Sequence, residues 1–408
     1  MPHHRRLLWA ILVGALAGVF CGWYFGPAMA AFAWVGKLFL DLLMLTIIPL
    51  IIAAVVSGIT ALGDVRKLGR LGGLTFLYYL STTAIAVFIG LVLVNIIQPG
   101  NHIKAPGTVI PEGLAGNHAA GIDEIIGSLI KPNLVEAAVN NQLLPIILFS
   151  LAFAAALTTI GDKGRTLVSF FDGLNDVMMK LVIWIMLLSP VGIFALIAAK
   201  LGATGGGAAF WRELSSVGMY FITVIIGLAI HFVVLFLILV SIGRRGRGYL
   251  LEMLRALLTA FGTASSAATL PLTMECALEA GVDKRAVKFV LPLGATVNMD
   301  GTALYEAVAV MFIAQAYGIS MDFTQQFIIF ITATFAAIGA AAIPSAGLVT
   351  MLIVLSAVGL PAEGIGLLLA IDWFLDRCRT TVNVWGDCVG TAVLDRLLAQ
   401  TAPETGSK

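Results

Sequence analysis

Six long runs of apolar residues constrain this chain more than any single motif does. A helix needs roughly 20 apolar residues to cross a bilayer. The runs lie near residues 7–33, 38–62, 71–98, 134–160, 167–199 and 215–242. Because 60% of the 408 residues are hydrophobic and 12% are charged, a water-soluble fold would expose too much apolar surface. The sequence therefore predicts an all-α polytopic membrane protein, and the first run is too long to be the core of a signal peptide.

Positive charges alternate between the loops that join these runs. Lys and Arg gather before the first run and near residues 66–70, 163–165 and 244–247, while the intervening loops carry few. By the positive-inside rule these loops are cytoplasmic, so we expect both termini, including the tail at 401–408, on that side. The loop at 99–123 is then extracytoplasmic. A formal net charge of +1 leaves no basic excess, so no nucleic-acid partner is expected.

Beyond residue 247 the apolar runs are interrupted by small residues, at 263–271 and at 336–347. Irregular backbone is tolerated inside a membrane where it lines a cavity, so we expect two re-entrant helical hairpins at about 249–281 and 322–362. Two kinked spans are the alternative, but they would put Lys284, Arg285 and Lys288 outside. With a long helix after each hairpin, the prediction is eight transmembrane helices plus two hairpins, arranged as inverted repeats that meet near the midplane.

The most polar stretch of the second half lies at 372–387, inside an apolar segment. If it is helical, its polar side chains fall on one face. Those side chains are Asp372, Asp376, Arg379, Thr380, Asn383 and Asp387. A charge at the bilayer centre costs about 2.5–3.5 kcal/mol, so this face must turn inward. It could be an ion-pair cluster that locks helices together, but the interleaved Thr, Asn and Gly favour a ligand site.

The chemistry of these side chains suits a charged solute and a hard cation. Arg379 can clamp a carboxylate in a bidentate manner, and Asp376, one turn earlier, can receive an ammonium group. The two tips, at Ser265 and Ser266 and at 343–347, can add hydroxyl, amide and carbonyl contacts. Oxygen ligands for sodium come from four side chains, beside backbone carbonyls expected to be freed near Gly301 and Gly386. The four are Asn298, Asp300, Asn383 and Asp387.

Three motifs together resemble the dicarboxylate/amino acid:cation symporter family, which includes the glutamate transporters. They are N-M-D-G-T at 298–302, the Ser-containing first tip, and D-x-x-R-T-x-x-N at 376–383. The resemblance extends over nearly the whole chain, and the short loops are similar to those of prokaryotic members. It implies a homotrimer in a bacterial inner membrane that carries substrate with about three sodium ions, with no organic cofactor. It also implies an elevator motion of mobile transport domains against a central scaffold.

The resemblance assigns each segment and each site residue a role. Scaffold helices are expected at 1–70 and 124–199, a sixth transmembrane helix at 200–248, and transport-domain segments at 71–98 and 249–400. Arg379 matches the ligand of the side-chain carboxylate, and Asp376 matches the ligand of the amino group. The remaining substrate contacts are matched by Ser266, Thr302, Thr380 and Asn383, with Ser265, Ile343 and Gly347 at the tips. The three sodium sites match Gly294, Asn298, Asn383 and Asp387; Thr296, Ala337, Ile338 and Ala340; and Tyr79, Thr82, Thr83, Asn298 and Asp300.

Substrate choice follows from Arg379 and Asp376 together, because dicarboxylate carriers tend to lack the Asp and neutral amino acid carriers tend to lack the Arg. An acidic amino acid, glutamate or aspartate, is therefore expected. A C4-dicarboxylate symporter is the alternative within the class, and an ion channel is the alternative outside it. No G-x-S-x-G motif or metal triad supports an enzyme, and His231 is interpreted as a helix-packing residue. The first tip lacks the Arg of some archaeal members, which leaves the inner gate undefined.

Glu306 is the candidate for proton and potassium coupling. It follows Asn298 and Thr302 at offsets of 8 and 4, which would place it on their face of a continuous helix. A buried carboxyl group is costly to keep ionised, so it suits a residue that loads and releases a proton. The matching Glu of animal glutamate transporters is implicated in that coupling. The alternative is a hydrogen-bonded Glu with no role in transport.

Overall fold

The structure is a computed structural model that describes residues 2–60, 69–101, 130–140, 143–203, 205, 207–338 and 346–399. Within these ranges the secondary structure is helical and contains no strand. The most N-terminal helices are α1 (Pro2–Phe25) and α2 (Ala33–Thr60), joined by a short 3-10 helix, η1 (Gly26–Phe32). The predicted first run of 7–33 ends as an α-helix at Phe25, because Gly26 takes a positive φ of 56° and Pro27 follows it.

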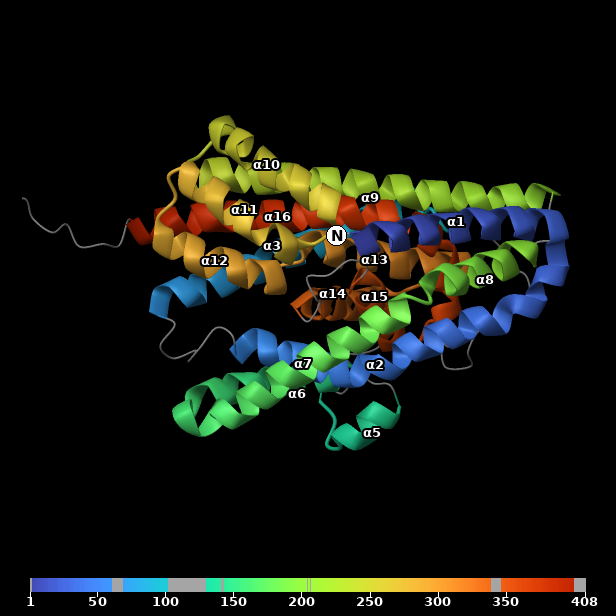
Figure 1. Cartoon of the computed structure of the whole chain (residues 1–408), viewed down its shortest axis with the longest axis horizontal. Helices are drawn as coiled ribbons and strands as arrows, with labels where there is room; N and C mark the ends of the chain where they lie inside the picture. The colour runs from blue at the N-terminus through green and yellow to red at the C-terminus, as the bar shows by residue number, and fades with distance from the viewer. Residues whose placement is uncertain are drawn as a thin grey trace, which may run out of the picture.

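One group of helices packs around α2. It contains α5 (Leu134–Val139), α6 (Leu143–Thr159), α7 (Arg165–Met186) and α8 (Ser189–Gly202), with η3 (Gly161–Gly164) between α6 and α7. The α2 helix contacts α6, α7 and α8, and α1 lies along α8. Figure 1 shows α6 and α7 at the edge of the molecule, beside α2.

The predicted single span at 167–199 is two helices that meet at an angle of 56°. The break falls at Leu187 and Leu188, directly before Pro190 in the first turn of α8. Proline has no backbone N–H to donate to the preceding turn, so it ends one helix and suits the start of the next. Apolar length alone does not reveal such a bend.

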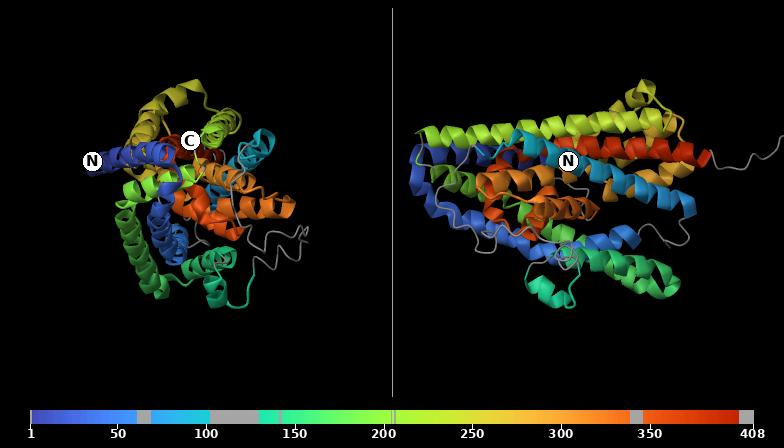
Figure 2. Two further views of the ribbon diagram at one scale, coloured as in Figure 1. Left: turned by 90° about the vertical axis from the view of Figure 1, so that its right-hand side faces the viewer. Right: turned by 180° about the vertical axis from the view of Figure 1, so that it is seen from behind.

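A second group of helices surrounds α16 (Leu369–Ala399). Two long helices, α3 (Gly69–Ile97) and α9 (Gly207–Ser241), run beside it, and α13 (Asp300–Ala316) contacts all three. Figure 2 shows α9 and α16 side by side over part of their length. Because α13 is buried along almost its whole length, polar side chains on it and on α16 face protein rather than lipid.

Four helical stretches of the described chain, or five if the bent pair counts as one span, are long and apolar enough to cross a membrane. One of them joins α1 to α2, and another joins α12 to α13. The helical membrane fold is confirmed, whereas the count of eight spans stays a prediction. The α16 helix is 31 residues long but carries several charged side chains, of which Asp372, Asp376, Arg379 and Asp387 are buried inside the protein.

The first hairpin consists of α10 (Arg247–Thr263) and α11 (Ser266–Glu279), which pack against each other. Its tip is only Ala264, with φ of 50°, and Ser265, whose hydroxyl accepts the backbone N–H of Ala268. The predicted interruption at 263–271 is therefore longer than the tip in the structure. Because Ser265 caps the new helix at once, the small residues after it are helical.

The second hairpin consists of α14 (Phe323–Ile338) and α15 (Ala346–Ala357), which also contact each other. Its tip, including the predicted ligands Ala340 and Ile343, lies outside the described residues. A 3-10 helix, η4 (Ala362–Leu367), then leads into α16. Each of the two hairpins is thus made of two short helices, as the sequence predicts.

The two polar stretches differ in their backbone. Between α12 (Lys284–Val297) and α13 the chain leaves the helix at Asn298 and Met299, so the expected break beside Gly301 is present. In contrast, α16 continues as a helix through Gly386. The expectation of a second break, with carbonyls freed near Gly386, is wrong. The likeness between 296–302 and 381–387 is one of sequence and does not extend to the backbone.

Candidate functional site

The polar face predicted for residues 372–387 exists and is buried. All its members lie on α16 and are at most 8% exposed. They are Asp372, Asp376, Arg379, Thr380, Asn383 and Asp387. Each faces α13 or its neighbours rather than the outer surface, so no charge of this face meets lipid.

Arg379 is the only cation of this face, and it is held from three sides. Its Nη2 donates to Asp376 Oδ1 at 2.8 Å and lies 3.1 Å from Asp372 Oδ1, an ion pair without hydrogen-bond geometry. The guanidinium lies 3.9 Å from the centre of the Tyr305 ring, a cation–π distance. Its Nε and Nη1 have no hydrogen-bond partner among the described residues. Those two donors are available to an anionic ligand.

The other predicted substrate residues surround this guanidinium or hold its surroundings in place. A Cβ atom at Gly347 would lie 2.7 Å from Arg379 Nη1, so the absence of a side chain there makes room for the cation. Asn383 accepts the N–H of Gly301 at 2.8 Å and donates to Thr302 Oγ1 at 3.3 Å, which fixes the start of α13 on α16. Thr380 donates to the carbonyl of Asp376 at 2.8 Å. Ser265 and Ser266 lie buried at the start of α11.

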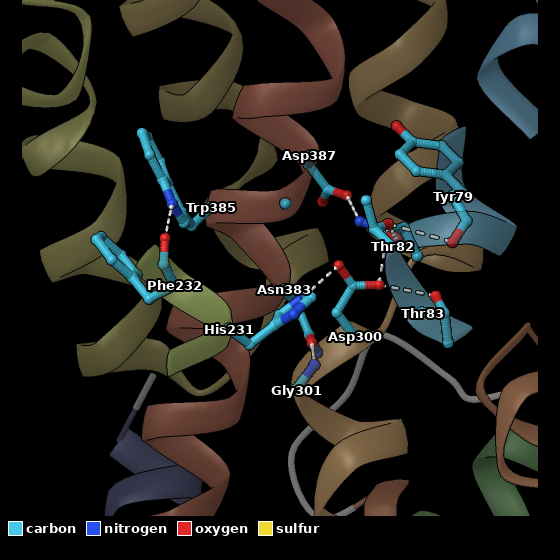
Figure 3. A network of polar contacts seen from close by, with 12 residues as sticks. Tyr79, Thr82, Thr83, His231, Phe232, Asp300, Gly301, Asn383, Trp385 and Asp387 are labelled. Carbon is cyan, nitrogen blue, oxygen red and sulfur yellow. Dashed lines mark hydrogen bonds and ion pairs between the residues drawn. The ribbon is translucent and has the colours of Figure 1, made fainter. Parts of the chain in front are cut away.

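A second polar network begins where α3 meets the break before α13 (Figure 3). Asp300 Oδ1 accepts hydrogen bonds from the hydroxyl of Thr83 at 2.7 Å and from the hydroxyl of Thr82 at 3.3 Å. Thr82 Oγ1 also lies 3.5 Å from Asn298 Oδ1. Five residues are predicted for one sodium site, and the side-chain oxygens of four of them therefore lie close together in the structure. Oxygen atoms at these spacings are what a hard cation requires.

Tyr79, the fifth predicted residue of that site, points its hydroxyl elsewhere. The hydroxyl donates to the carbonyl of Val290 at 2.7 Å, while the backbone carbonyl of Tyr79 accepts Thr82 Oγ1 at 3.2 Å. Only the carbonyl of Tyr79 therefore lies beside the Thr82 hydroxyl. The phenol instead joins α3 to α12.

Residues of a further predicted sodium site are also adjacent. Asn298 Nδ2 donates to Asp387 Oδ1 at 3.0 Å, and Gly294 lies against the same carboxylate. A Cβ atom at Gly386 would lie 2.9 Å from Asn298 Nδ2 and 3.2 Å from Asp300 Oδ2. The small residue therefore lets the broken segment approach α16. Asn383, predicted for both this site and the substrate, is engaged with Gly301 and Thr302.

The remaining predicted sodium site is described only in part. Thr296 stands in the last turn of α12, and Ala337 and Ile338 end α14, which contacts α12. The side chain of Thr296 donates to the carbonyl of Leu293 at 2.9 Å. The predicted fourth member, Ala340, lies outside the described residues.

Glu306 is fully buried on α13 and accepts a hydrogen bond from Thr350 of α15. Its second carboxyl oxygen has no partner among the described residues. Thr302 shares its helical face, as predicted, but Asn298 precedes the break and so does not. Glu306 therefore connects α15 of the second hairpin to α13, the helix that begins at Asp300.

Several residues of the site escape sequence reasoning. Arg377 of α16 donates to the carbonyls of Phe261 and Gly262 at 2.8 and 2.7 Å, so the cation that holds the first tip comes from α16 and not from the tip itself. Tyr305 stands in an apolar run with no local signal of its role. His231 is interpreted from the sequence only as a helix-packing residue, and its contact with Asp300 is not predicted.

Charge does not balance inside this region. Among the described residues, the buried Asp side chains here are those at 300, 372, 376 and 387, and the only buried Lys or Arg is Arg379. If all four Asp are ionised, four carboxylates against one guanidinium leave three negative charges in a low-dielectric interior. Such an interior demands cations or protons, and an arrangement of this kind is what a cation-coupled membrane transporter requires.

The comparisons with known proteins agree with that class. The model of the sodium:dicarboxylate symporter family matches residues 7–397, and this chain belongs to that family. Excitatory amino acid transporter 1 of Ambystoma tigrinum is 38% identical to it, over 95% of this chain and 81% of that protein. Excitatory amino acid transporter 2 of Homo sapiens is 39% identical, over 96% and 79%. Excitatory amino acid transporter 3 of Mus musculus is 40% identical, over 90% and 79%. These proteins are transporters, so the chain is a multi-pass membrane transporter rather than an enzyme.

Proposed function

We propose that this protein is a sodium-coupled symporter of acidic amino acids, with glutamate or aspartate as the transported substrate. The observation that carries the proposal is the pairing of Arg379 with Asp376 on one buried face of α16. A guanidinium with two available donors suits a side-chain carboxylate, and a carboxylate beside it suits an ammonium group. The names of the relatives, excitatory amino acid transporters, support the same class of substrate.

A C4-dicarboxylate is the second candidate, because the family name includes dicarboxylates. Such a substrate would use Arg379 but would leave Asp376 facing a second carboxylate, which is unfavourable. An ion channel, the candidate from another class, needs no saturable solute site. The buried and specifically paired Arg379 therefore favours a symporter.

Sodium is proposed as the coupled ion at the oxygen-rich positions around Asp300 and Asp387. The excess of buried Asp side chains over buried Lys or Arg among the described residues supports coupling to several cations, and about three sodium ions per cycle are proposed. Glu306 is proposed to carry a proton in one half of the cycle, with potassium countertransport in the other. Its burial and its hydrogen bond to Thr350 in an arm of the second hairpin support a residue whose protonation responds to movement of that hairpin.

The proposed movement is an elevator. The helices around α16, together with the two hairpins, form the transport domain, and α1, α2 and α6–α8 form the scaffold. Packing supports this division, since α3, α9 and α13 contact α16, whereas α1 and α2 pack chiefly on α8, α7 and α6. We also propose a homotrimer in a bacterial inner membrane, with both termini cytoplasmic.

The direct test is uptake by the purified protein in liposomes with an inward sodium gradient. Radiolabelled L-glutamate, L-aspartate and succinate are compared at equal concentration, with choline replacing sodium as the control. Saturable, sodium-dependent uptake of the amino acids, with succinate much weaker, is expected. Faster transport of succinate would show that the protein is a C4-dicarboxylate symporter. Flux of ions without accumulation of solute would show that it is an ion channel.

A further inference from the structure

His231 is a fully buried polar side chain in the apolar helix α9, far in sequence from the motifs that define the site. Its Nε2 lies 3.0 Å from Asp300 Oδ2 (Figure 3). An aromatic or aliphatic side chain would fill the same space between helices equally well. A ring nitrogen aimed at a buried carboxylate therefore implies a polar role beyond packing.

The ring contacts its described surroundings through one nitrogen. Nδ1 has no hydrogen-bond partner among the described residues. Nε2 is the nitrogen that faces Asp300 Oδ2. A proton on Nε2 donates to that carboxylate oxygen, so the geometry fits a hydrogen-bond donor aimed at Asp300.

The two oxygens of Asp300 are divided between different neighbours. Oδ2 faces His231, while Oδ1 faces the hydroxyls of Thr82 and Thr83. The Oδ1 side offers further oxygen atoms, namely the two hydroxyls and Asn298 Oδ1 beyond Thr82. A donor on Oδ2 therefore fixes the rotation of the carboxylate so that the other oxygen faces the place where a cation would be coordinated. Groups behind a ligand commonly orient it in this way.

The residue next to His231 makes a packing contact with α16. The carbonyl of Phe232 accepts the Nε1–H of Trp385 from α16 at 3.2 Å, and the two rings stack with centres 5.1 Å apart. This contact joins α9 to α16 and involves Phe232 rather than His231. Helices α3 and α9 thus both supply hydrogen-bonding groups to the carboxylate of Asp300 on α13.

We propose that His231 is a positioning residue for sodium binding, acting as a hydrogen-bond donor that orients the carboxylate of Asp300. The inference rests on the proposed sodium coupling and deepens it, because it names a residue that determines sodium affinity without coordinating the ion. Loss of a hydrogen bond to a charged group typically corresponds to roughly a tenfold or larger change in an equilibrium constant.

The test measures sodium binding directly, without transport. Purified protein in detergent micelles is titrated with sodium, with choline holding ionic strength constant, and the sodium-dependent rise in unfolding temperature gives the apparent affinity. His231→Leu and His231→Met remove the donor, whereas His231→Gln keeps a donor near the position of Nε2. Trp385→Phe removes the neighbouring bond between α9 and α16 and serves as the packing control.

We expect His231→Leu and His231→Met to weaken apparent sodium affinity by about tenfold, with His231→Gln and Trp385→Phe staying within about threefold of the wild type. Wild-type sodium affinity in both donor-free variants would overturn the inference, as would an equal loss in the Gln variant or in the Trp385 control. Asp300→Asn in the same titration distinguishes a failure of the proposed sodium site from a failure of the role of His231. If Asp300→Asn also leaves sodium affinity unchanged, the proposed sodium site itself is wrong; if it alone weakens binding, only the role of His231 fails.

Discussion

At the scale of single residues, Arg379 is in place before a substrate arrives. Asp372, Asp376 and the ring of Tyr305 hold the guanidinium, while two of its nitrogens keep no partner among the described residues. A ligand that binds there need not order the cation first, and such preorganisation lowers the entropic cost of binding. The same arrangement means that removing the cation leaves two buried carboxylates uncompensated.

Replacing Arg379 by Cys should abolish uptake of acidic amino acids and allow neutral amino acids to be carried instead. Breaking a desolvated charge pair costs roughly 2–5 kcal/mol, which is a loss of affinity of about thirtyfold or more. Uptake of labelled glutamate and of labelled serine is measured for both proteins, with Tyr305→Phe, which keeps the ring under the cation, as the control. Unchanged glutamate affinity in the Cys variant would refute the assignment.

Asp376 should discriminate by the ammonium group of the substrate. In Asp376→Ser we expect the affinity for glutamate to fall at least tenfold more than the affinity for succinate, because only glutamate has an ammonium to lose its partner. Competition by each compound against one labelled substrate provides the measurement. Asp372→Ser removes the other partner of Arg379 and is the matched control. Equal losses for both compounds in the Asp376 variant would remove the ammonium role.

Glu306 should make uptake sensitive to pH. If the carboxyl group takes up a proton before translocation and releases it inside, initial uptake rises as external pH falls and the liposome interior acidifies. Glu306→Gln keeps a group that can accept a hydrogen bond from Thr350 but cannot carry a proton, so its uptake should depend little on pH while sodium-driven exchange persists. Uptake is followed from about pH 5 to 9 with a pH-sensitive dye inside. Identical profiles without acidification by the wild type would leave Glu306 with a structural role.

The sequence predicts some of these residues and not others for a physical reason. Helical spacing places Asp376 and Arg379 on one face because both belong to one helix. Tyr305, His231 and Thr350 meet their partners across different helices, and their own surroundings in the sequence are apolar. No local pattern encodes the register of one buried helix against another, so these contacts required the structure.

At the scale of helices and hairpins, the ends of α12 and of the first hairpin are held by polar contacts outside the membrane-spanning segments. Asp283 accepts the backbone N–H of Arg285 at 2.8 Å and so caps α12. That hydrogen bond, with help from the guanidinium of Arg285, lowers the pKa of Asp283 below its ordinary value. A lowered pKa means that ionised Asp283 stabilises the folded state, and the contribution is lost as pH falls through the folded-state pKa.

Asp283→Ala should therefore lower thermal stability at neutral pH by about 1 kcal/mol or less, since the group is exposed. The difference from the wild type should be constant above about pH 4, the ordinary value for Asp, and shrink below it. Asp283→Asn keeps a capping oxygen without a titrating charge, so its stability relative to the Ala variant should be independent of pH. Unfolding temperatures of the three proteins in detergent provide the data. A difference that grows on acidification would contradict the cap.

Helix ends could be predicted only where chain chemistry dictates them. The break before Asp300 was anticipated from the N-M-D-G-T stretch, whereas Gly386 sits in an uninterrupted helix despite a similar sequence. Small residues such as Ala, Ser and Thr are compatible with both helix and turn, so composition alone predicts a longer first tip than the structure has. The cap at Ser265 decides where α11 begins, and a hydrogen bond of that kind is not visible in hydropathy.

At the scale of the whole molecule, the buried Asp side chains of the site outnumber Arg379, the one buried Lys or Arg among the described residues, and their ionised forms leave a deficit of positive charge. An anionic amino acid adds to this deficit rather than relieving it. Substrate and cations should therefore bind together, since each makes the other's desolvation less costly, and such mutual dependence is reciprocal. Coupling of this kind also provides the driving force, at about 2.3 kcal/mol per ion per 100 mV and about 1.4 kcal/mol per tenfold gradient.

The most direct measurement is the steady-state accumulation of labelled aspartate or glutamate in liposomes as the sodium gradient is varied at a clamped membrane potential. The logarithm of the accumulation ratio should rise with the logarithm of the sodium gradient with a slope of about two to three, and Asp387→Asn should reduce both sodium affinity and the steepness of sodium activation. A slope near zero, or wild-type sodium affinity and steepness in Asp387→Asn, would contradict sodium-coupled symport through this site.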